Sequence, residues 1–197
     1  EIIRRLWSGE FVDFEGSYYR IRHAKLYDIP TIPIPLLIAA SGPKMCQVAG
    51  RLGDGILPVA SIPEFNSLVL PNLEKGAKEA GKDPEKLIKM VELKIAFGED
   101  YDRSLENCRF WKTTGIEGHI GLTSDPVEIE QIAEETVTDD RIRDLWFITT
   151  EIDEVTDRIQ TYIDAGYNWI QIHSCSPDEE DFIRHLGSDV LPNIVFE

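Results

Sequence analysis

The sequence has little positive charge, few cysteines and no long hydrophobic segment. Lys and Arg together number 20 against 36 Asp and Glu, which gives a formal net charge of −16. A field of that sign repels nucleic acid and anionic membranes, so neither is expected as a partner. No apolar run reaches the roughly 20 residues that a membrane-spanning helix needs, and no signal peptide is apparent.

The cysteines are too few and too scattered for a disulfide framework. Cys46, Cys108 and Cys175 lie far apart, no CxxC motif occurs, and an odd number cannot pair completely. They predict reduced thiols in a cytoplasmic protein. No metal site is expected.

The sequence does contain enough apolar residues for a globular fold. Hydrophobic residues make up 42% of the 197 positions, which is sufficient for one domain with a core. The first residue is Glu1 and not Met, and Ile2, Ile3 and Leu6 fall on one helical face. We therefore expect this sequence to begin partway through the protein, with an N-terminal part preceding it.

One stretch organises the chain, the apolar run from Pro35 to Ala40 followed by Ser41-Gly42-Pro43. Such a run, bounded by turn residues, predicts a buried strand. Gly42 allows a sharp turn, and Pro43 suits the first position of a helix. The free N–H groups at a helix start form an anion site, so a cofactor phosphate is the favoured ligand. An ordinary strand-to-helix connection without a ligand is the alternative.

The order of elements predicts an α/β fold with a parallel sheet. Strands alternate with helices, and a region of about residues 98–147 is too long for a simple connection, so it is expected to be an inserted helical lobe. A hairpin is expected over 11–21 and strands over 35–40, 56–59, 90–97 and 169–173. Four βα units are half of a TIM (β/α)8 barrel. The prediction is one partial barrel domain over 1–197, completed by another piece of protein.

The strand over 90–97 carries two charges on one face. Val91, Leu93 and Ile95 alternate with Glu92 and Lys94. If helices cover the apolar face, both charges point into the barrel interior, where they should pair. A structural ion pair, or exposure at a strand end, is the alternative to a catalytic role.

Several motifs resemble a known family. The segments LWSGEFVDFEGSYYRI (6–21) and LIAASGPKMCQVAGRLGDGIL (37–57) resemble the bacterial luciferase-like superfamily of barrel oxidoreductases. The segments at 107–111 and 125–130, and the stretch around Trp146, are similar to its branch of F420-dependent glucose-6-phosphate dehydrogenases. The resemblance covers nearly the whole chain and corresponds to the C-terminal half of those enzymes.

This resemblance implies that coenzyme F420 binds with its phosphate-bearing tail against the loop after the first central strand. The implied contacts are Ala40, Ser41, Gly42, Lys44 and Met45. The family's catalytic His and its acidic partner lie in the N-terminal half, so no catalytic residue is assigned in this segment. Relatives also suggest a homodimer, and a deazaflavin user with so acidic a surface would fit an archaeal source.

The departures from the family concern the substrate. The basic residues that hold the sugar phosphate are replaced here by Ile62 and Leu145, and the third falls in a gapped loop near His119 without a Lys. Glucose 6-phosphate is therefore not expected, because each lost charge-assisted hydrogen bond is worth ~1.5–3 kcal/mol. Lys112 or Arg143 could compensate from nearby only if the loops are rebuilt. The implied pocket of Val59, Ile62, His119, Leu145 and His173 favours a less charged substrate such as an alcohol. For His173 a structural, hydrogen-bonded role is the alternative.

The resulting hypothesis is an F420-dependent dehydrogenase that moves a hydride between the cofactor and a small organic substrate. An FMN-dependent luciferase-like monooxygenase is a second enzyme hypothesis. A third is a non-catalytic half-barrel, either a fragment or one piece of a split protein.

Overall fold

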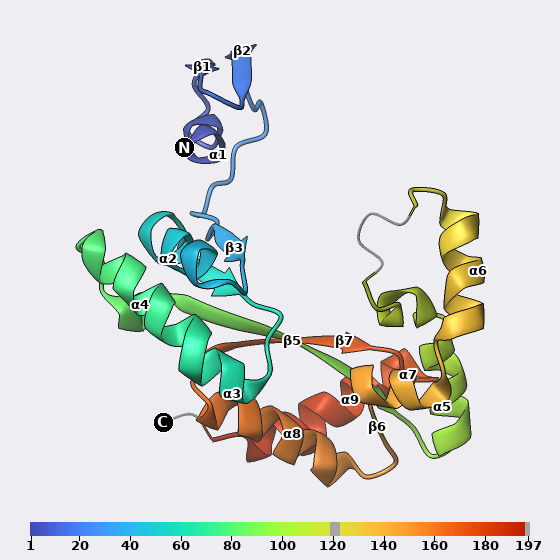
Figure 1. Ribbon diagram of the computed structural model, residues 1–197. Coiled ribbons are helices and arrows are strands. Elements are labelled where there is room, and N and C mark those ends of the chain that lie inside the picture. The colour runs from blue at the N-terminus through green and yellow to red at the C-terminus, as the bar shows by residue number, and fades with distance from the viewer. Residues whose placement is uncertain (119–122, 196–197) are drawn as a thin grey trace. The chain divides into compact units, whose positions relative to one another are not determined.

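The computed structural model describes residues 1–118 and 123–195, and it divides into two compact units, residues 1–36 and 37–197. In the first unit, helix α1 (Ile2–Leu6) is followed by an antiparallel hairpin of β1 (Val12–Glu15) and β2 (Arg20–Ala24), drawn in blue in Figure 1. The Phe11 and His23 rings stack with centroids 4.0 Å apart. The hairpin is confirmed as predicted.

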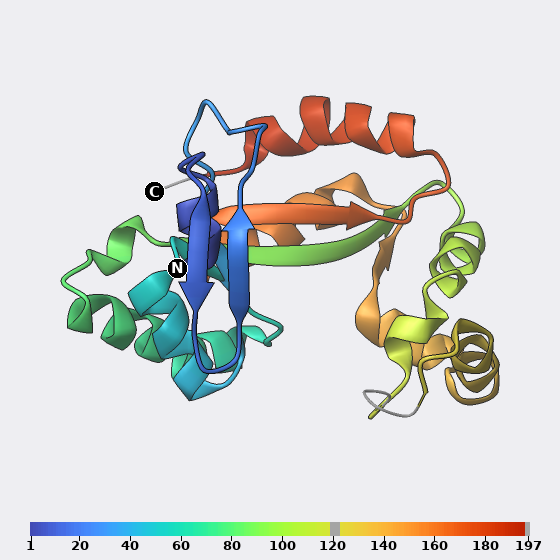
Figure 2. The ribbon, with the colours of Figure 1, turned by 90° about the horizontal axis from the view of Figure 1, so that it is seen from above.

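The second unit is built on a five-stranded parallel sheet. Its strands are β3 (Leu37–Ala39), β4 (Gly55–Leu57), β5 (Ile88–Phe97), β6 (Phe147–Thr149) and β7 (Trp169–Ser174). β5 is the long central strand. β4 pairs with its beginning, β6 with its end and β7 with the stretch between, so β5 and β7 run together through the unit (Figures 1 and 2).

One edge of β5 is only partly covered. β6 and β7 both pair with Ile95, so they lie on opposite edges of β5. β4 lies on the same edge of β5 as β6. The Ile88 N–H donates to the Asp54 carbonyl just before β4. The next residue, Lys89, points to the opposite edge, where it exchanges hydrogen bonds with Asn168 just before β7. Among the described residues, the β4–β6 edge has no strand partner between Lys89 and Ile95.

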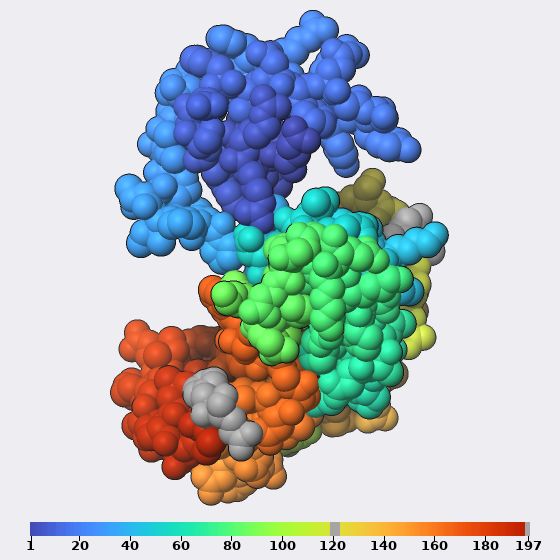
Figure 3. Space-filling view, turned by 90° about the vertical axis from the view of Figure 1, so that its left-hand side faces the viewer, coloured from blue at the N-terminus to red at the C-terminus, as the bar shows by residue number. Residues whose placement is uncertain are grey.

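Helices cover one face of the sheet. They are α2 (Pro43–Leu52), the continuous helical run of α3 (Ile62–Glu64), η1 (Phe65–Val69) and α4 (Leu70–Glu79), and the C-terminal helices α8 (Ile152–Asp164) and α9 (Glu179–His185). Short turns η2 (Pro84–Lys86), η4 (Leu186–Val190) and η5 (Leu191–Asn193) connect or follow them. Figure 3 shows α4 in green beside the orange C-terminal segment on one face.

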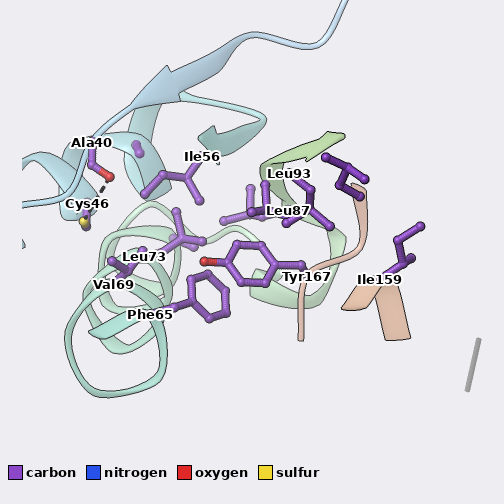
Figure 4. Close-up of a cluster of buried hydrophobic side chains, with 14 of the residues drawn as sticks. Ala40, Cys46, Ile56, Phe65, Val69, Leu73, Leu87, Leu93, Ile159 and Tyr167 are labelled. Atoms are coloured by element: carbon purple, nitrogen blue, oxygen red, sulfur yellow. Dashed lines mark hydrogen bonds between the residues drawn. The ribbon is translucent and has the colours of Figure 1, made fainter. Parts of the chain in front are cut away.

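The main core lies between these helices and the sheet. Val91, Leu93 and Ile95 of β5 are buried in it, as the alternation predicts. The Phe65 and Tyr167 rings stack at 3.9 Å between the α3–α4 run and the start of β7 (Figure 4). The opposite face of β5 and β7 therefore carries the polar side chains.

The region between β5 and β6 forms a second core of its own. It contains α5 (Tyr101–Arg109), η3 (Lys112–Gly115), α6 (Pro126–Thr136) and α7 (Asp139–Leu145). Their apolar residues gather around Trp146 and around Ala96 at the end of β5. α7 and β6 were not predicted from the sequence. The single domain over 1–197 and the insertion boundaries stay predictions. Among the described residues, no helix combines the length and apolarity needed to cross a bilayer.

Candidate functional site

The loop from β3 into α2 has the predicted strand, turn and helix start. Gly42 is the N-cap residue of α2 and Pro43 occupies the first helical turn. Gly42 has φ −88° and ψ 151°, an extended conformation that any residue can adopt. The chain bends at Gly42 as predicted, but this backbone conformation does not require a glycine, and what Gly42 contributes is the absence of a side chain.

That missing side chain leaves the start of α2 open. The first hydrogen bond of the helix runs from the Cys46 N–H to the Gly42 carbonyl at 3.0 Å. The N–H groups of Lys44 and Met45 precede this bond and so have no helical acceptor, and none of the described residues supplies one. By contrast α3, α5, α6, α7 and α9 each begin with a capping Ser, Thr or Asp side chain. The α2 terminus thus keeps its N–H groups available for an outside anion.

Ser41, the residue before the N-cap Gly42, does not cap α2 either. Its hydroxyl donates to the Val59 carbonyl at 3.0 Å and accepts from the Val59 N–H at 3.1 Å. Both bonds link the loop after β3 to the loop after β4. The hydroxyl is therefore committed to the scaffold, and a ligand at the α2 terminus would meet the backbone of Ser41 rather than its side chain.

The remaining predicted cofactor contacts also lie around this terminus. Lys44 and Met45 are exposed, whereas the Ala40 methyl group is buried in the core and only 8% exposed. A Cβ atom placed on Gly42 would find no atom within 4 Å. The surface in front of the N–H groups is thus open, and residues 40–45 fit an anionic group such as a phosphate. We refer to residues 40–45 as the amide cradle.

A cavity of about 530 Å³ lies in the same unit, beside the uncovered edge of β5. Its lining includes Val59, Glu92, Lys94, Arg143, Leu145 and Arg158. Val59 is also the residue that Ser41 binds, so hydrogen bonds connect the amide cradle to the cavity wall. The cavity occupies the place where β4 and β6 separate along β5.

Most charged side chains that line this cavity pack on an aromatic ring or accept hydrogen bonds from a neighbour. The Arg158 guanidinium lies 5.3 Å from the centroids of Phe147 and Tyr162, and Lys94 Nζ lies 5.9 Å from the centroid of Trp146. Hydrogen bonds from the Ser61 N–H and hydroxyl hold the pKa of the Glu64 carboxyl below its usual range. The cavity thus offers cations packed on aromatic rings beside apolar side chains.

Glu92 and His173 join at the polar face of the sheet. His173 Nδ1 and Glu92 Oε1 are 2.9 Å apart. The imidazole meets Trp111 edge-on at 4.6 Å between centroids and Trp146 at 5.0 Å. The prediction that Glu92 pairs with Lys94 is therefore wrong. Glu92 instead reaches diagonally across to His173 on β7.

The structure brings together only part of the predicted substrate pocket. Val59 and Leu145 line the cavity, and His173 adjoins it through Glu92. Ile62 is half-buried in α3 and does not line the cavity, and His119 lies outside the described residues. These five residues stay predictions as a substrate site.

Sequence reasoning did not assign Glu92, Trp111, Trp146 or Arg158 to the site. The alternation of β5 placed Glu92 on the correct face, but nothing in the sequence pairs it with a residue 81 positions away. Within residues 1–118 and 123–195, no group of three or more His, Cys, Asp or Glu side chains could hold a metal ion.

Comparison with known protein families gives one match that covers most of the chain. The family described as luciferase-like monooxygenase matches residues 1–168. The F420-dependent glucose-6-phosphate dehydrogenase of Intrasporangium calvum is 34% identical over 197 residues, and that of Mycolicibacterium gilvum is 33% identical over 196 residues. Each alignment covers 98% of this chain and 58% of the relative, so the chain spans somewhat more than half the length of these relatives.

Solved structures agree with this match. An F420-dependent secondary alcohol dehydrogenase in complex with an F420–acetone adduct superposes with a TM-score of 0.83 at 29% identity, covering 98% of this chain and 59% of that one. The coenzyme F420-dependent tetrahydromethanopterin reductase of Methanopyrus kandleri gives 0.71 at 24% identity, covering 98% and 61%. These neighbours are TIM barrels, so the predicted fold class is confirmed.

Proposed function

This chain belongs to the luciferase-like monooxygenase family, and on that premise we propose that it is part of an F420-dependent oxidoreductase. The reaction is hydride transfer between coenzyme F420 and a small organic substrate. The observation that carries the proposal is the amide cradle, an uncapped helix start at the carboxyl end of β3 with its N–H groups open. Barrel enzymes build their active sites at that end of the strands.

The cofactor assignment is supported by the chemistry of the cradle and by the relatives. The N–H groups of Gly42, Lys44 and Met45 suit an anionic tail, with the Ala40 and Ser41 backbone beside them. Relatives named as F420-dependent align over this segment. F420, when bound, supplies the carbon that takes or gives the hydride. The chain's own part is to grip the tail and to orient the substrate.

The substrate is an alcohol-like molecule in this proposal. Ile62 and Leu145 offer no charge at the positions where a sugar phosphate would be bound, and Val59 and Leu145 make part of the cavity wall apolar. The cations of the cavity are engaged elsewhere, Arg143 with Asp140 and Lys94 and Arg158 with aromatic rings. Of the two solved structures described above, the one with the higher TM-score is named as a secondary alcohol dehydrogenase. Glucose 6-phosphate is the less favoured substrate, despite the names of the relatives.

The proposal extends to the assembly of the protein. We propose that in the active protein a further segment closes the barrel between β3 and β7, and that this protein is a cytoplasmic homodimer. Neither nucleic acid nor membrane is a partner. The archaeal source stays a prediction.

The test is a titration of the natural, full-length protein with F420 and, separately, with FMN, followed by fluorescence. The proposal expects micromolar or tighter binding of F420 and weak binding of FMN. Binding of neither cofactor would favour a non-catalytic half-barrel. Preference for FMN, with oxygen consumption, would instead make the protein a luciferase-like monooxygenase.

A further inference from the structure

Glu92 and His173 stand on the polar face of the sheet, next to the cavity. The register pairs Lys94 with His173 and Glu92 with Gln171, so Glu92 is the diagonal neighbour of His173 across the β5–β7 ladder. Val91, Leu93 and Ile172 alternate with them and belong to the opposite, apolar side. The backbone therefore fixes both side chains to one face, within reach of each other.

The hydrogen bond between them defines where the imidazole proton sits. The Nδ1 to Oε1 distance of 2.9 Å is a full hydrogen bond. An ionised Glu92 carboxylate can only accept, so in that state the proton of this bond lies on Nδ1. A neutral His173 then carries no proton on Nε2, which becomes an acceptor.

The surroundings hold the ring in this orientation. Trp111 meets the imidazole at an interplanar angle of 89° and Trp146 at 69°, from two different parts of the second core. Trp146 is itself only 2% exposed, so it is a fixed wall. Rotating the ring would break the bond to Glu92. Lys94, which is in register with His173 and has its Nζ 5.9 Å from the Trp146 ring centroid, is a further charge on this face.

The remaining ring nitrogen is left available. Nε2 has no hydrogen-bond partner in the described part of the chain, and it is not among the buried polar atoms that lack one. The side chain of His173 is 23% exposed and that of Glu92 is 40% exposed. His173 also lies near the carboxyl end of β7, the end of a barrel strand where ligands bind.

We propose that Glu92 is a positioning residue that fixes His173 as the Nδ1–H tautomer and thereby presents Nε2 as the hydrogen-bond acceptor for a substrate hydroxyl. The substrate part of this inference rests on the proposed function. The tautomer does not, because it follows from the Glu92 bond alone.

The first test is nitrogen-15 NMR of the histidine side chains in the natural, full-length protein. Wild-type His173 is expected in the Nδ1–H form. Glu92→Gln, whose amide can donate as well as accept, should shift His173 towards the Nε2–H form that free imidazole prefers. Glu79→Gln, which removes an exposed partner of Arg51 elsewhere, is the matched control and should leave His173 unchanged. Wild-type His173 protonated on Nε2, or no response to Glu92→Gln, would overturn the proposal.

The second test separates the positioning role from the proposed function. With F420 and a secondary alcohol, Glu92→Gln should lower kcat/KM at least tenfold while the affinity for F420 stays unchanged. If the protein fails to bind F420, the proposed function falls but the NMR result still decides the tautomer. If F420 binds and kcat/KM is unaffected by Glu92→Gln, the substrate role of His173 is wrong.

Discussion

The amide cradle depends on how closely α2 approaches α4, and one substitution tests that approach. A Cβ atom on Gly76 of α4 would lie 2.0 Å from the Gln47 carbonyl oxygen and 2.7 Å from its carbonyl carbon in α2. Gly50 of α2 approaches α4 about as closely, since a Cβ atom on Gly50 would lie 2.1 Å from the Leu73 carbonyl oxygen. Both obstacles are backbone atoms, which cannot rotate away. Gly76→Ala should therefore push the two helices apart.

The expected magnitude is a balance of two effects. Alanine in a helix interior is favoured over glycine by ~1 kcal/mol. Overpacking of a well-filled contact costs typically ~1–3 kcal/mol and occasionally more, and a clash with rigid backbone belongs at the upper end. The net result is a loss of about 2 kcal/mol in the free energy of unfolding. With a urea m-value of about 1–3 kcal/mol per molar, the midpoint should fall by about 1 M.

The assay is urea unfolding followed by circular dichroism, with Gly187→Ala as the control. A Cβ on Gly187 would have no atom within 4 Å, so this variant should unfold at or slightly above the wild-type midpoint. Gly76→Ala should also weaken F420 binding, because α2 carries the cradle. A Gly76→Ala protein as stable as wild type would refute the close helix contact on which the position of the cradle depends.

Three further predictions test other parts of the structure. Ser41→Ala removes both hydrogen bonds to Val59 and should lower stability by ~1 kcal/mol and weaken F420 binding, as measured by urea unfolding and cofactor titration. Tyr167→Phe removes a buried hydroxyl that has no partner among the described residues, so it should leave the urea midpoint unchanged or raise it. Burial also raises the pKa of Tyr167, so wild type should lose stability as the pH rises above the ordinary tyrosine value of about 10, and Tyr167→Phe should lose less. Cys46 and Cys108 are fully buried, and burial raises the thiol pKa of Cys46, whereas the neighbouring Cys175 together with burial raises that of Cys108. Both should resist iodoacetamide in the folded protein and react in urea, as mass spectrometry would show.

Local patterns predicted the elements that are long or sharply bounded. The alternation in β5 placed Val91, Leu93 and Ile95 in the core, and Pro43 marked the start of α2 correctly. α7 and β6 span seven and three residues, too few for a period to emerge. β3 and β4 are equally short but lie beside Pro and Gly turn residues, which β6 lacks. The place of α7 and β6 in the fold depends on packing around Trp146, which is a tertiary effect.

The site was predicted less completely than the fold, for a physical reason. The sequence identified the cradle because strand, turn and helix start are contiguous. The bond between Glu92 and His173 joins two strands, and the bonds between Ser41 and Val59 join two loops, so each depends on the register of the sheet. The same limit explains why Lys94 was expected to be the partner of Glu92.

The most direct test of the central claim is a proton–nitrogen-15 correlation spectrum of the natural protein during titration with F420. Binding of the anionic tail at the start of α2 predicts saturable shifts of the amide signals of Gly42, Lys44 and Met45, with the affinity found by fluorescence. Saturable binding of F420 that leaves these three signals in place would contradict the claim.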